Sequence, residues 1–156
     1  KRWMYEESFK SPLLMRWPNT IKPDTEITEL VQNIDLAPTF LKAAGLAVPE
    51  NLHGLPLQPL FLKKSNRSWR KDILYQYFDG GTPEKRGPYN MPRHEGIRDE
   101  RYKLISFYEF NQWEFYDLKN DPMELNNLFG KKILNPEIKR LQKRLSYLKN
   151  KFFESD

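Results

Sequence analysis

The clearest periodic pattern of apolar residues lies near the end of the chain. Five of them recur there at spacings of three and four: Ile138, Leu141, Leu145, Leu148 and Phe152. That spacing is the period of one face of an α-helix. Asn135 can cap such a helix, and Pro136 suits its first turn. The pattern predicts a helix over residues 137–152 whose apolar face must pack on another element.

Four stretches rich in aromatic and β-branched residues precede this helix and predict strands. They are residues 72–78, 94–98, 101–107 and 113–118. Asp99 and Glu100 supply a tight turn between the second and third. These strands would form a four-stranded antiparallel sheet, and the C-terminal helix would cover its apolar face because that face cannot stay in water. Residues 79–92 lack periodicity and predict a long loop, of a kind that is often functional.

A short apolar run near the N-terminus predicts a buried strand. Leu13, Leu14 and Met15 stand between two prolines. A continuous apolar run of this length is typical of a strand covered on both faces, and such a strand needs sheet neighbours. Residues 25–31 alternate enough to predict a second, short extended segment that pairs at an edge.

A short helix should follow, with Asn33 or Asp35 as its cap. Pro38 suits its first turn, and Gly45 suits its C-terminal end. Four residues share one helical face and are expected in the core: Leu36, Phe40, Leu41 and Ala44. Residues 57–62 predict one further helical turn, ahead of a basic linker over residues 63–71.

Composition supports an α+β fold with many loops. The chain has 156 residues and a mass of 18.8 kDa, which is the size of one domain, and 38% of its residues are hydrophobic. Twelve prolines and a mean hydropathy of −0.80 predict loops between short elements. We therefore expect an α+β fold and not a helical bundle.

Charge and cysteine content narrow the chemistry. A net charge of +5 and an isoelectric point near 9.3 would favour sulfated glycans, nucleic acid or acidic membrane surfaces. The surplus is spread along the chain, which favours an ordinary solvated surface. The absence of cysteine excludes disulfides, thiolate metal sites and a thiol nucleophile. The chain has no initiating methionine, signal-peptide pattern or apolar run of the roughly twenty residues that a membrane span needs. Removal of an N-terminal part would explain these features.

Four segments carry a family resemblance, in the family's order. They are KRWMYEESFKSPLLMRWP (1–18), NIDLAPTFLKAAG (33–45), HEGIRDERYKLI (94–105) and WEFYDLKNDPMELNNL (113–128). Together they resemble the C-terminal third of a sulfatase of the arylsulfatase type, in the alkaline-phosphatase-like superfamily. The resemblance implies that residues 1–62 are the tail end of the catalytic α/β domain, residues 63–71 a linker, and residues 72–156 the small C-terminal subdomain. The strand at residues 13–15 and the short helix would complete the parent's catalytic domain.

The resemblance gives Lys1 a catalytic role. In such sulfatases the lysine at the head of this segment reaches the sulfate group of the substrate, and Lys1 aligns with it. An ammonium there can neutralise charge that develops on the sulfate and leaving-group oxygens. The alternative is a terminal lysine in solvent, since chain ends usually fray.

The rest of the family's catalytic chemistry should lie outside these residues. The family's nucleophile is a formylglycine made within a Cys/Ser-x-Pro-x-Arg motif, and no proline here has Cys or Ser two positions before it. The family's calcium ligands also precede the segment that begins at Lys1. We therefore expect no cofactor bound by this fragment, calcium and formylglycine in the missing N-terminal part, and no activity from the fragment alone.

Arg93 and His94 are the candidate substrate-binding residues. They follow the long loop and stand at the start of a strand, in a subdomain that by resemblance lies along the substrate cleft. An arginine fork matches sulfate or carboxylate oxygens, and a histidine can donate to a glycosidic or ester oxygen. The alternative is a surface histidine beside a strand-edge arginine. His53, in a proline-rich loop, is expected to be structural.

Residues 117–128 contain enough side-chain oxygens to suggest a calcium loop. They lack the regular Asp-x-Asp-x-Asp-Gly spacing that wraps such an ion. By resemblance, Asp121 and Asn127 instead hydrogen-bond the backbone of the turn. We therefore assign no metal ligand.

The predicted function is hydrolysis of sulfate esters by the whole enzyme, on a carbohydrate or aryl substrate, with this part shaping the substrate cleft. The partners would be a sulfated small molecule or glycan and the protein's own N-terminal catalytic domain, with no nucleic acid and no membrane span. Two alternatives stay open: a phosphonate or phosphodiester hydrolase of the same superfamily, and a non-catalytic module that binds polyanions. The family suggests a periplasmic, secreted or lysosomal location.

Overall fold

A computed structural model describes residues 2–62, 69–79 and 91–153 of the chain. The chain divides into two compact units, one formed by residues 1–12 with 72–156 and the other by residues 13–71. We call the first the sheet unit and the second the α2 unit, and describe each by itself. The division near residue 71 coincides with the end of the expected linker. Residues 2–12, however, group with the sheet and not with the residues that follow them.

The sheet unit contains the expected four-stranded antiparallel sheet. Its strands are β1 (Asp72–Tyr77), β2 (His94–Asp99), β3 (Tyr102–Phe107) and β4 (Gln112–Asp117). They lie in the order β1-β2-β3-β4, and every neighbouring pair is antiparallel. The prediction of four strands is confirmed, with bounds within about one residue of those expected.

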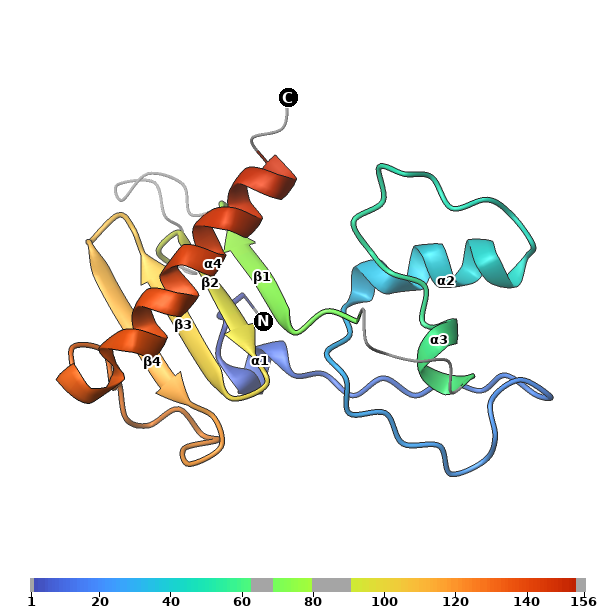
Figure 1. Cartoon of the computed structure of the whole chain (residues 1–156), viewed down its shortest axis with the longest axis horizontal. Coiled ribbons are helices and arrows are strands. Elements are labelled where there is room, and N and C mark those ends of the chain that lie inside the picture. The colour runs from blue at the N-terminus through green and yellow to red at the C-terminus, as the bar shows by residue number, and fades with distance from the viewer. Residues whose placement is uncertain (1, 63–68, 80–90, 154–156) are drawn as a thin grey trace. The chain divides into compact units, whose positions relative to one another are not determined.

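Helix α4 (Asn135–Phe153) covers one face of this sheet, as predicted (Figure 1). The core between them consists of three strand residues and four helix residues: Ile97, Leu104 and Phe115 with Ile138, Leu141, Leu145 and Leu148. Phe152 is partly buried against the same cluster. The helical spacing read from the sequence therefore identified the buried face of α4 correctly.

The opposite face of the sheet is covered by the N-terminal segment. Residues 3–5 and the short helix α1 (Glu6–Phe9) pack there. The apolar cluster on this face contains Met4, Ile105, Phe107, Tyr116 and Leu118. The sequence predicted a cover for one face only, so the second cover is a feature that sequence reasoning missed.

The turn after β4 has the backbone hydrogen bonds that were expected. Both oxygens of Asp121 accept main-chain N–H groups, from Leu125 at 3.1 Å and from Asn126 at 2.8 Å. The side-chain oxygen of Asn127 accepts from the N–H groups of Phe115 and Phe129. These bonds confirm the structural interpretation of both residues. A short 3₁₀ turn, η2 (Lys132–Leu134), then leads into α4.

The α2 unit consists of short helices joined by irregular chain. It contains η1 (Asn33–Asp35), α2 (Leu36–Ala43) and α3 (Gln58–Phe61). Gly45 has a φ of 73°, a left-handed conformation that suits a glycine after a helix. The predicted helix, its end and the later helical turn are therefore confirmed.

The predicted buried face of α2 is wrong for Phe40 and Ala44, whereas Leu36 packs against the core cluster of this unit and Leu41 is partly buried. The residues that are buried are Pro38 and Thr39, whereas Phe40 is 62% exposed and Ala44 is also exposed. Thr39 explains the rotation of the helix, because its hydroxyl accepts from the main chain of Leu57 and donates to the main chain of Asp35. A polar contact, and not the apolar stripe, decides which side of α2 faces inward.

Asp35 organises the polar centre of this unit. Its carboxylate forms a two-pronged ion pair with Arg70 and accepts the main-chain N–H groups of Gln32 at 2.7 Å and Leu55 at 2.8 Å. Trp69 donates its indole N–H to the carbonyl of Leu30. Residues 69 and 70 of the expected linker are thus attached to the unit. Residues 63–68 lie outside the described part.

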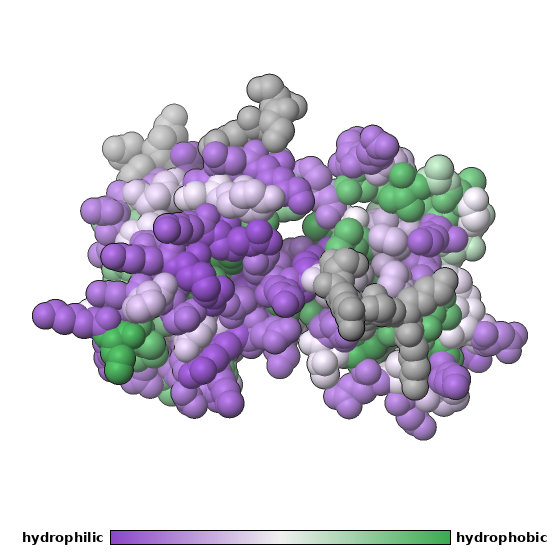
Figure 2. All heavy atoms as spheres, viewed as in Figure 1, coloured by the Kyte–Doolittle hydropathy of each residue, from purple (hydrophilic) through white to green (hydrophobic). Residues whose placement is uncertain are grey.

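The strand predicted at residues 13–15 does not form. Leu14 is 94% exposed, and the backbone of these residues has no assigned strand partner in the described part of the chain. Residues 25–31 form no strand either. A strand that is covered on both faces needs sheet neighbours, and these residues have none here. Hydrophobic side chains accordingly gather on the visible face of the α2 unit (Figure 2).

Candidate functional site: the His94 cluster

His94 lies at the centre of an aromatic cluster in the sheet unit. It is the first residue of β2, and its side chain is fully buried. The rings of Trp3, Tyr75, Tyr77 and Phe107 surround the imidazole at centroid distances of 5.4–5.6 Å. We call these five residues the His94 cluster. The N-terminal segment, β1, β2 and β3 each contribute to it, so distant parts of the sequence meet here.

The hydrogen bonds of His94 fix its tautomer. Its Nδ1 lies 2.9 Å from the carbonyl oxygen of Pro92 and must donate, because a carbonyl can only accept. Burial lowers the pKa of His94 below its usual value, although the Pro92 carbonyl opposes this shift. The ring is therefore neutral at pH 7, and Nε2 carries a lone pair. Nε2 is buried and has no hydrogen-bond partner among the described residues.

This geometry alters the chemistry expected of His94. The sequence suggested a histidine that donates to a substrate oxygen. With Nδ1–H directed at Pro92, Nε2 can only accept, and its burial leaves a substrate no access to it in the described structure. The alternative of a surface histidine is wrong, because the side chain is completely buried.

Arg93 immediately precedes the cluster and is half-buried. Its main-chain N–H donates to Glu109 Oε2 at 2.9 Å, which ties the start of β2 to the turn between β3 and β4. Its guanidinium Nε is buried without a hydrogen-bond partner in the described structure. Arg93 Nε and His94 Nε2 are thus one donor and one acceptor that the described residues do not satisfy.

A second group of hydrogen bonds holds the N-terminal segment, residues 3–5, on the sheet. The phenols of Tyr5 and Tyr116 both donate to Glu114 Oε2, at 2.8 and 3.0 Å. Burial, followed by the charge of Glu114 and hydrogen bonding to it, raises the pKa of both phenols. Both tyrosines therefore stay protonated and act as donors. Trp3 stacks on Tyr5 at 5.8 Å, so this group is continuous with the His94 cluster.

Lys103 is a buried cation that sequence reasoning missed. Its Nζ lies 2.8 Å from Glu6 Oε1 and 2.7 Å from Glu124 Oε1, and it donates to the carbonyl oxygen of Met4 at 2.6 Å. Strand alternation was the available signal, because it places Lys103 on the same face as Ile105 and Phe107. A lysine on an apolar sheet face needs carboxylate partners.

Lys1, the predicted sulfate-contacting residue, lies outside the described residues. Its sequence neighbour Arg2 is described, and the carbonyl oxygen of Arg2 accepts the phenol of Tyr75. The chain directly after Lys1 therefore lies beside the His94 cluster. The predicted role of Lys1 stays a prediction.

The described residues contain no group of three or more histidine, aspartate or glutamate side chains that could hold a metal ion. The whole sequence also lacks a Cys/Ser-x-Pro motif for a formylglycine. We derive no reaction step from either group within this chain.

At least three of the six cations of α4 form ion pairs with acidic side chains. Arg140 binds Asp99 and Glu137, Arg144 binds Asp72 at 2.6 Å, and Lys149 binds Glu95 at 2.9 Å. Purple, hydrophilic side chains cover much of the visible face of the sheet unit (Figure 2). Pairing with acidic side chains favours the solvated-surface interpretation over a polyanion-binding helix. None of the described helices is long and apolar enough to cross a membrane.

Comparison with known proteins identifies the family. Residues 1–151 match the family described as "N-sulphoglucosamine sulphohydrolase, C-terminal". The chain belongs to this family of sulfatase C-terminal regions. The resemblance read from four sequence segments is confirmed, as is the α+β fold.

Particular relatives are carbohydrate sulfatases. The chain is 38% identical over 159 residues to an N-acetylglucosamine-6-O-sulfatase of Bacteroides thetaiotaomicron, covering 100% of this chain and 28% of that protein. It is 33% identical over 165 residues to the N-acetylglucosamine-6-sulfatase of Bos taurus, covering 88% and 29%. The chain thus spans less than a third of the length of these relatives.

A solved structure supports the same conclusion. It is of a protein in complex with its substrate D-glucosamine-2-N,6-O-disulfate, with a TM-score of 0.90 and 36% identity over 99% of this chain and 31% of that one. A phosphonate monoester hydrolase from Silicibacter pomeroyi has a TM-score of 0.75 at 20% identity, covering 90% and 29%. That second likeness shows the fold alone.

Proposed function

We propose that this chain is the C-terminal part of an enzyme that hydrolyses a 6-O-sulfate ester on an N-acetylglucosamine or related glucosamine unit. The observation that carries the proposal is the identity of 38% over the whole chain to an N-acetylglucosamine-6-O-sulfatase. The substrate named for the most similar structure described above, a 2-N,6-O-disulfated glucosamine, supports a sulfated amino sugar as the substrate class. The rest of the protein would supply the nucleophile.

Within this function, the end of the sheet that holds the His94 cluster would line the substrate cleft. The guanidinium of half-buried Arg93 is a donor suited to a sulfate or carboxylate oxygen. His94 is fully buried, so it would support this end of the sheet from within the aromatic cluster. Lys1 would place an ammonium at the sulfate itself, where it stabilises charge that develops during cleavage.

The supporting chemistry would come from residues that precede this chain. We propose that the whole protein uses calcium and a formylglycine, as the resemblance to sulfatases implies. Calcium would stabilise the sulfate oxygens, and the formylglycine would supply the nucleophile. This chain would contribute positioning and transition-state charge. The predicted boundaries of residues 1–62, 63–71 and 72–156, and the predicted periplasmic, secreted or lysosomal location, stay proposals.

The test uses the full-length protein that contains this chain, supplied with calcium. We expect sulfate release from N-acetylglucosamine 6-O-sulfate, and much slower release from glucosamine that carries only an N-sulfate. Lys1→Ala should lower the rate of ester cleavage about 10²–10³-fold, by analogy with the loss of an oxyanion donor. Arg93→Gln should lower kcat/KM about 10-fold or more, because it removes a charge-assisted hydrogen bond.

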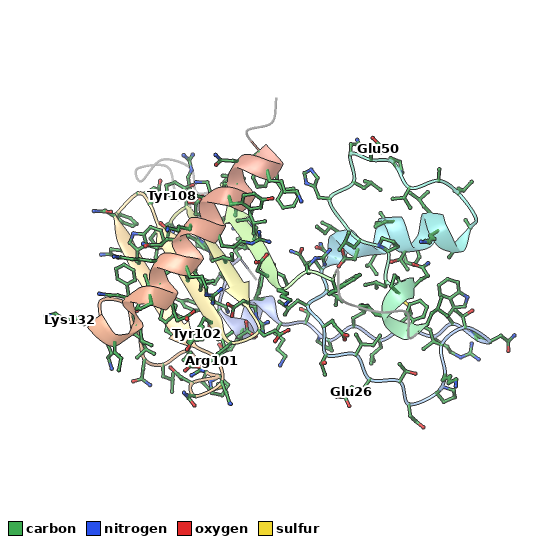
Figure 3. The ribbon with its side chains drawn as sticks, viewed as in Figure 1. Glu26, Glu50, Arg101, Tyr102, Tyr108 and Lys132 are labelled. Atoms are coloured by element: carbon green, nitrogen blue, oxygen red, sulfur yellow. The ribbon has the colours of Figure 1, made fainter. Side chains whose placement is uncertain are left out.

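Arg101→Gln is the matched control for Arg93→Gln. It also removes a guanidinium, but at the start of β3, which is the end of the sheet away from Arg93. Figure 3 labels Arg101 and Tyr108 at the two ends of β3. The control should keep kcat/KM within about threefold. No sulfate release from either sugar would overturn the proposed function. An unchanged rate for Lys1→Ala would overturn the role of Lys1 alone.

The alternative of a phosphonate or phosphodiester hydrolase is tested in the same assay. The likeness to a phosphonate monoester hydrolase concerns the fold only, at 20% identity. We expect a phosphonate monoester to react more slowly than the 6-O-sulfate. A higher kcat/KM on the phosphonate would favour the alternative.

A further inference from the structure

Lys103 is fully buried, and most of its contacts lie in one short segment of the chain. Its Nζ touches the carbonyl oxygen of Met4, the carboxylate of Glu6 at 2.8 Å and the ring of Phe9, whose centroid is 5.6 Å away. The remaining partner is Glu124, at 2.7 Å. Lys103 belongs to β3, so a single strand residue holds residues 4–9 at three points.

The charges around Lys103 balance. Glu6 also faces Arg98 at 3.2 Å, and Glu124 Oε2 accepts the main-chain N–H of Glu6 at 2.5 Å. Two cations therefore meet two carboxylates. Burial alone would raise the pKa of Glu6, but Lys103 and Arg98 outweigh it and hold that pKa below its usual value. Glu124 has a φ of 56°, an unfavourable conformation that brings a charged side chain into the network.

Close packing also holds residues 4–9 on the sheet. Met4 is fully buried above Gly96 of β2, where an added Cβ would lie 2.5 Å from the Met4 sulfur and 2.4 Å from the carbonyl oxygen of Leu104. Trp3 then stacks on the imidazole of His94 at 5.6 Å. A displacement of residues 4–9 on the sheet would therefore also move Trp3 relative to His94.

The N-terminal segment is tethered at the point where Lys103 binds the Met4 carbonyl. Buried ion pairs are weak evidence for stability, because desolvation offsets most of their attraction. A role in setting geometry accounts for this network better than a role in stability.

We propose that Lys103, with Glu124, is a positioning residue for sulfate-ester cleavage: the buried network holds residues 3–9 on the sheet, and with them Trp3 beside His94 and the start of the chain that leads back to Lys1. This inference rests on the proposed function, in which Lys1 contacts the sulfate. Lys103 itself touches no substrate. It acts through the segment that it holds.

The test is a double-mutant cycle in the full-length protein, with N-acetylglucosamine 6-O-sulfate as the probe. Lys103→Met removes the ammonium and keeps much of the side-chain volume. It should lower kcat about 10–100-fold with a smaller change in KM, because a displacement of about 1 Å can cost that much. In a Lys1→Ala background the same change should cost less than about threefold, since the group that Lys103 positions is already absent.

Arg101→Met is the matched control. Arg101 pairs with the buried carboxylate of Asp117 at 2.8 Å, so its loss also leaves a buried carboxylate without its cation, but it contacts none of residues 2–12 in the described structure. It should change kcat by less than about threefold, and by the same factor with or without Lys1. Glu124→Gln is a milder second variant, which leaves Lys103 with Glu6 and the Met4 carbonyl. It should lower kcat about 3–10-fold.

Amide hydrogen exchange of the same variants gives a readout that does not depend on activity. Lys103→Met and Glu124→Gln should speed exchange in residues 4–9 at least about tenfold and leave β2 and β3 protected. Unchanged exchange there, or equal losses of kcat with and without Lys1, would overturn the inference and leave the proposed function intact. Loss of exchange protection throughout the sheet in both variants would also overturn it, because the network would then serve stability. An inactive wild-type protein would instead overturn the proposed function, and the inference with it.

Discussion

The sheet unit and the α2 unit bury their side chains in different ways. The sheet unit covers both faces of a sheet, with α4 on one side and the N-terminal segment on the other, around two apolar clusters. The α2 unit has one small cluster around Leu57, Leu60 and Phe61, and its helices are joined through the carboxylate of Asp35. It leaves Leu14, Phe40 and Leu46 at least 60% exposed.

The difference lies in how the cores are built. Both faces of the sheet are covered within the described residues, whereas the α2 unit has a single small cluster. Each unit also leaves large apolar side chains exposed, among them Leu14 and Phe40 in the α2 unit and Leu125 and Ile133 in the sheet unit. Exposed apolar surface often marks a contact with another element or chain. We expect the preceding part of a full-length sulfatase to cover the α2 unit, where residues 13–15 would find the sheet neighbours that a buried strand requires.

The largest expected effect is in the α2 unit, where Asp35→Ala removes the carboxylate that joins its elements. The change leaves Arg70 and two main-chain N–H groups without their partner, and breaking a buried ion pair in this way typically costs about 3–5 kcal/mol. Hydrogen exchange of the 156-residue chain should show α2 and α3 losing protection while β2 and β3 keep theirs. Glu26→Ala, at an exposed position labelled in Figure 3, is the control. Equal loss of protection in both units would show that they unfold together.

Leu145→Ala tests the apolar core of the sheet unit. Leu145 is buried between α4 and the sheet, so its truncation should lower the free energy of unfolding by about 2–5 kcal/mol, as measured by chemical denaturation. Lys143→Ala, on the exposed side of the same helix, should stay within about 0.5 kcal/mol. A fully stable Leu145→Ala protein would contradict the packing of α4. A Lys143→Ala protein that loses tight, salt-sensitive heparin binding would instead favour the polyanion-binding alternative.

Acid should weaken the sheet unit, by less than either core substitution. Hydrogen bonds from Arg101 lower the pKa of Asp117, and Lys103 with Arg98 lowers the pKa of Glu6 despite its burial. The stability that these carboxylates contribute is complete above their unfolded pKa values of about 3.9 and 4.3, and is lost as the pH falls through the lower folded values. Denaturation midpoints should therefore decrease from about pH 5 to pH 3. Asp117→Asn should flatten this dependence, and an unchanged slope would remove Asp117 as its source.

The smallest effect is expected for Phe40→Ala in α2. The apolar pattern places Phe40 in a core, but its side chain is 62% exposed, so truncation should change the free energy of unfolding by less than about 0.5 kcal/mol. Denaturation of the 156-residue chain measures this directly. In a full-length protein the same change should cost more, because we expect the α2 unit to be covered there. Equal, negligible effects in both proteins would contradict that expectation.

Local pattern predicted the sheet unit well because its signals are strong and consistent. Period-two strands, a tight turn at Asp99 and Glu100, and a helix with five apolar residues on one face all agree with one fold. The same reasoning misplaced Phe40 of α2 and Ala44 at its end. This helix has only eight residues, and one of them, Thr39, is a polar residue that competes with the apolar ones for the buried side. There the hydroxyl of Thr39 decided the buried face, and no apolar periodicity reports on such a contact.

The sequence likewise indicated some features of the candidate site and missed others. Arg93 and His94 were singled out from their place after a long loop and at the start of a strand, and their role in substrate binding stays a prediction. The tautomer of His94 was not found from the sequence, because it depends on the carbonyl of Pro92. The partners of Lys103 were not found either, since Glu6 lies 97 positions before it and Glu124 lies 21 positions after it in the sequence.

The sequence by itself determined the family, the order of the four strands and α4, and the apolar face of α4, because each depends on residue identity and short-range spacing. Only the tertiary structure decided that residues 2–12 belong with the sheet, that Lys103 is buried among carboxylates, and that Leu13 and Leu14 stay exposed. These outcomes depend on contacts between distant residues. A buried charge needs an opposite charge beside it, and an apolar run needs other residues to cover it. The fold as a whole decides where those partners lie.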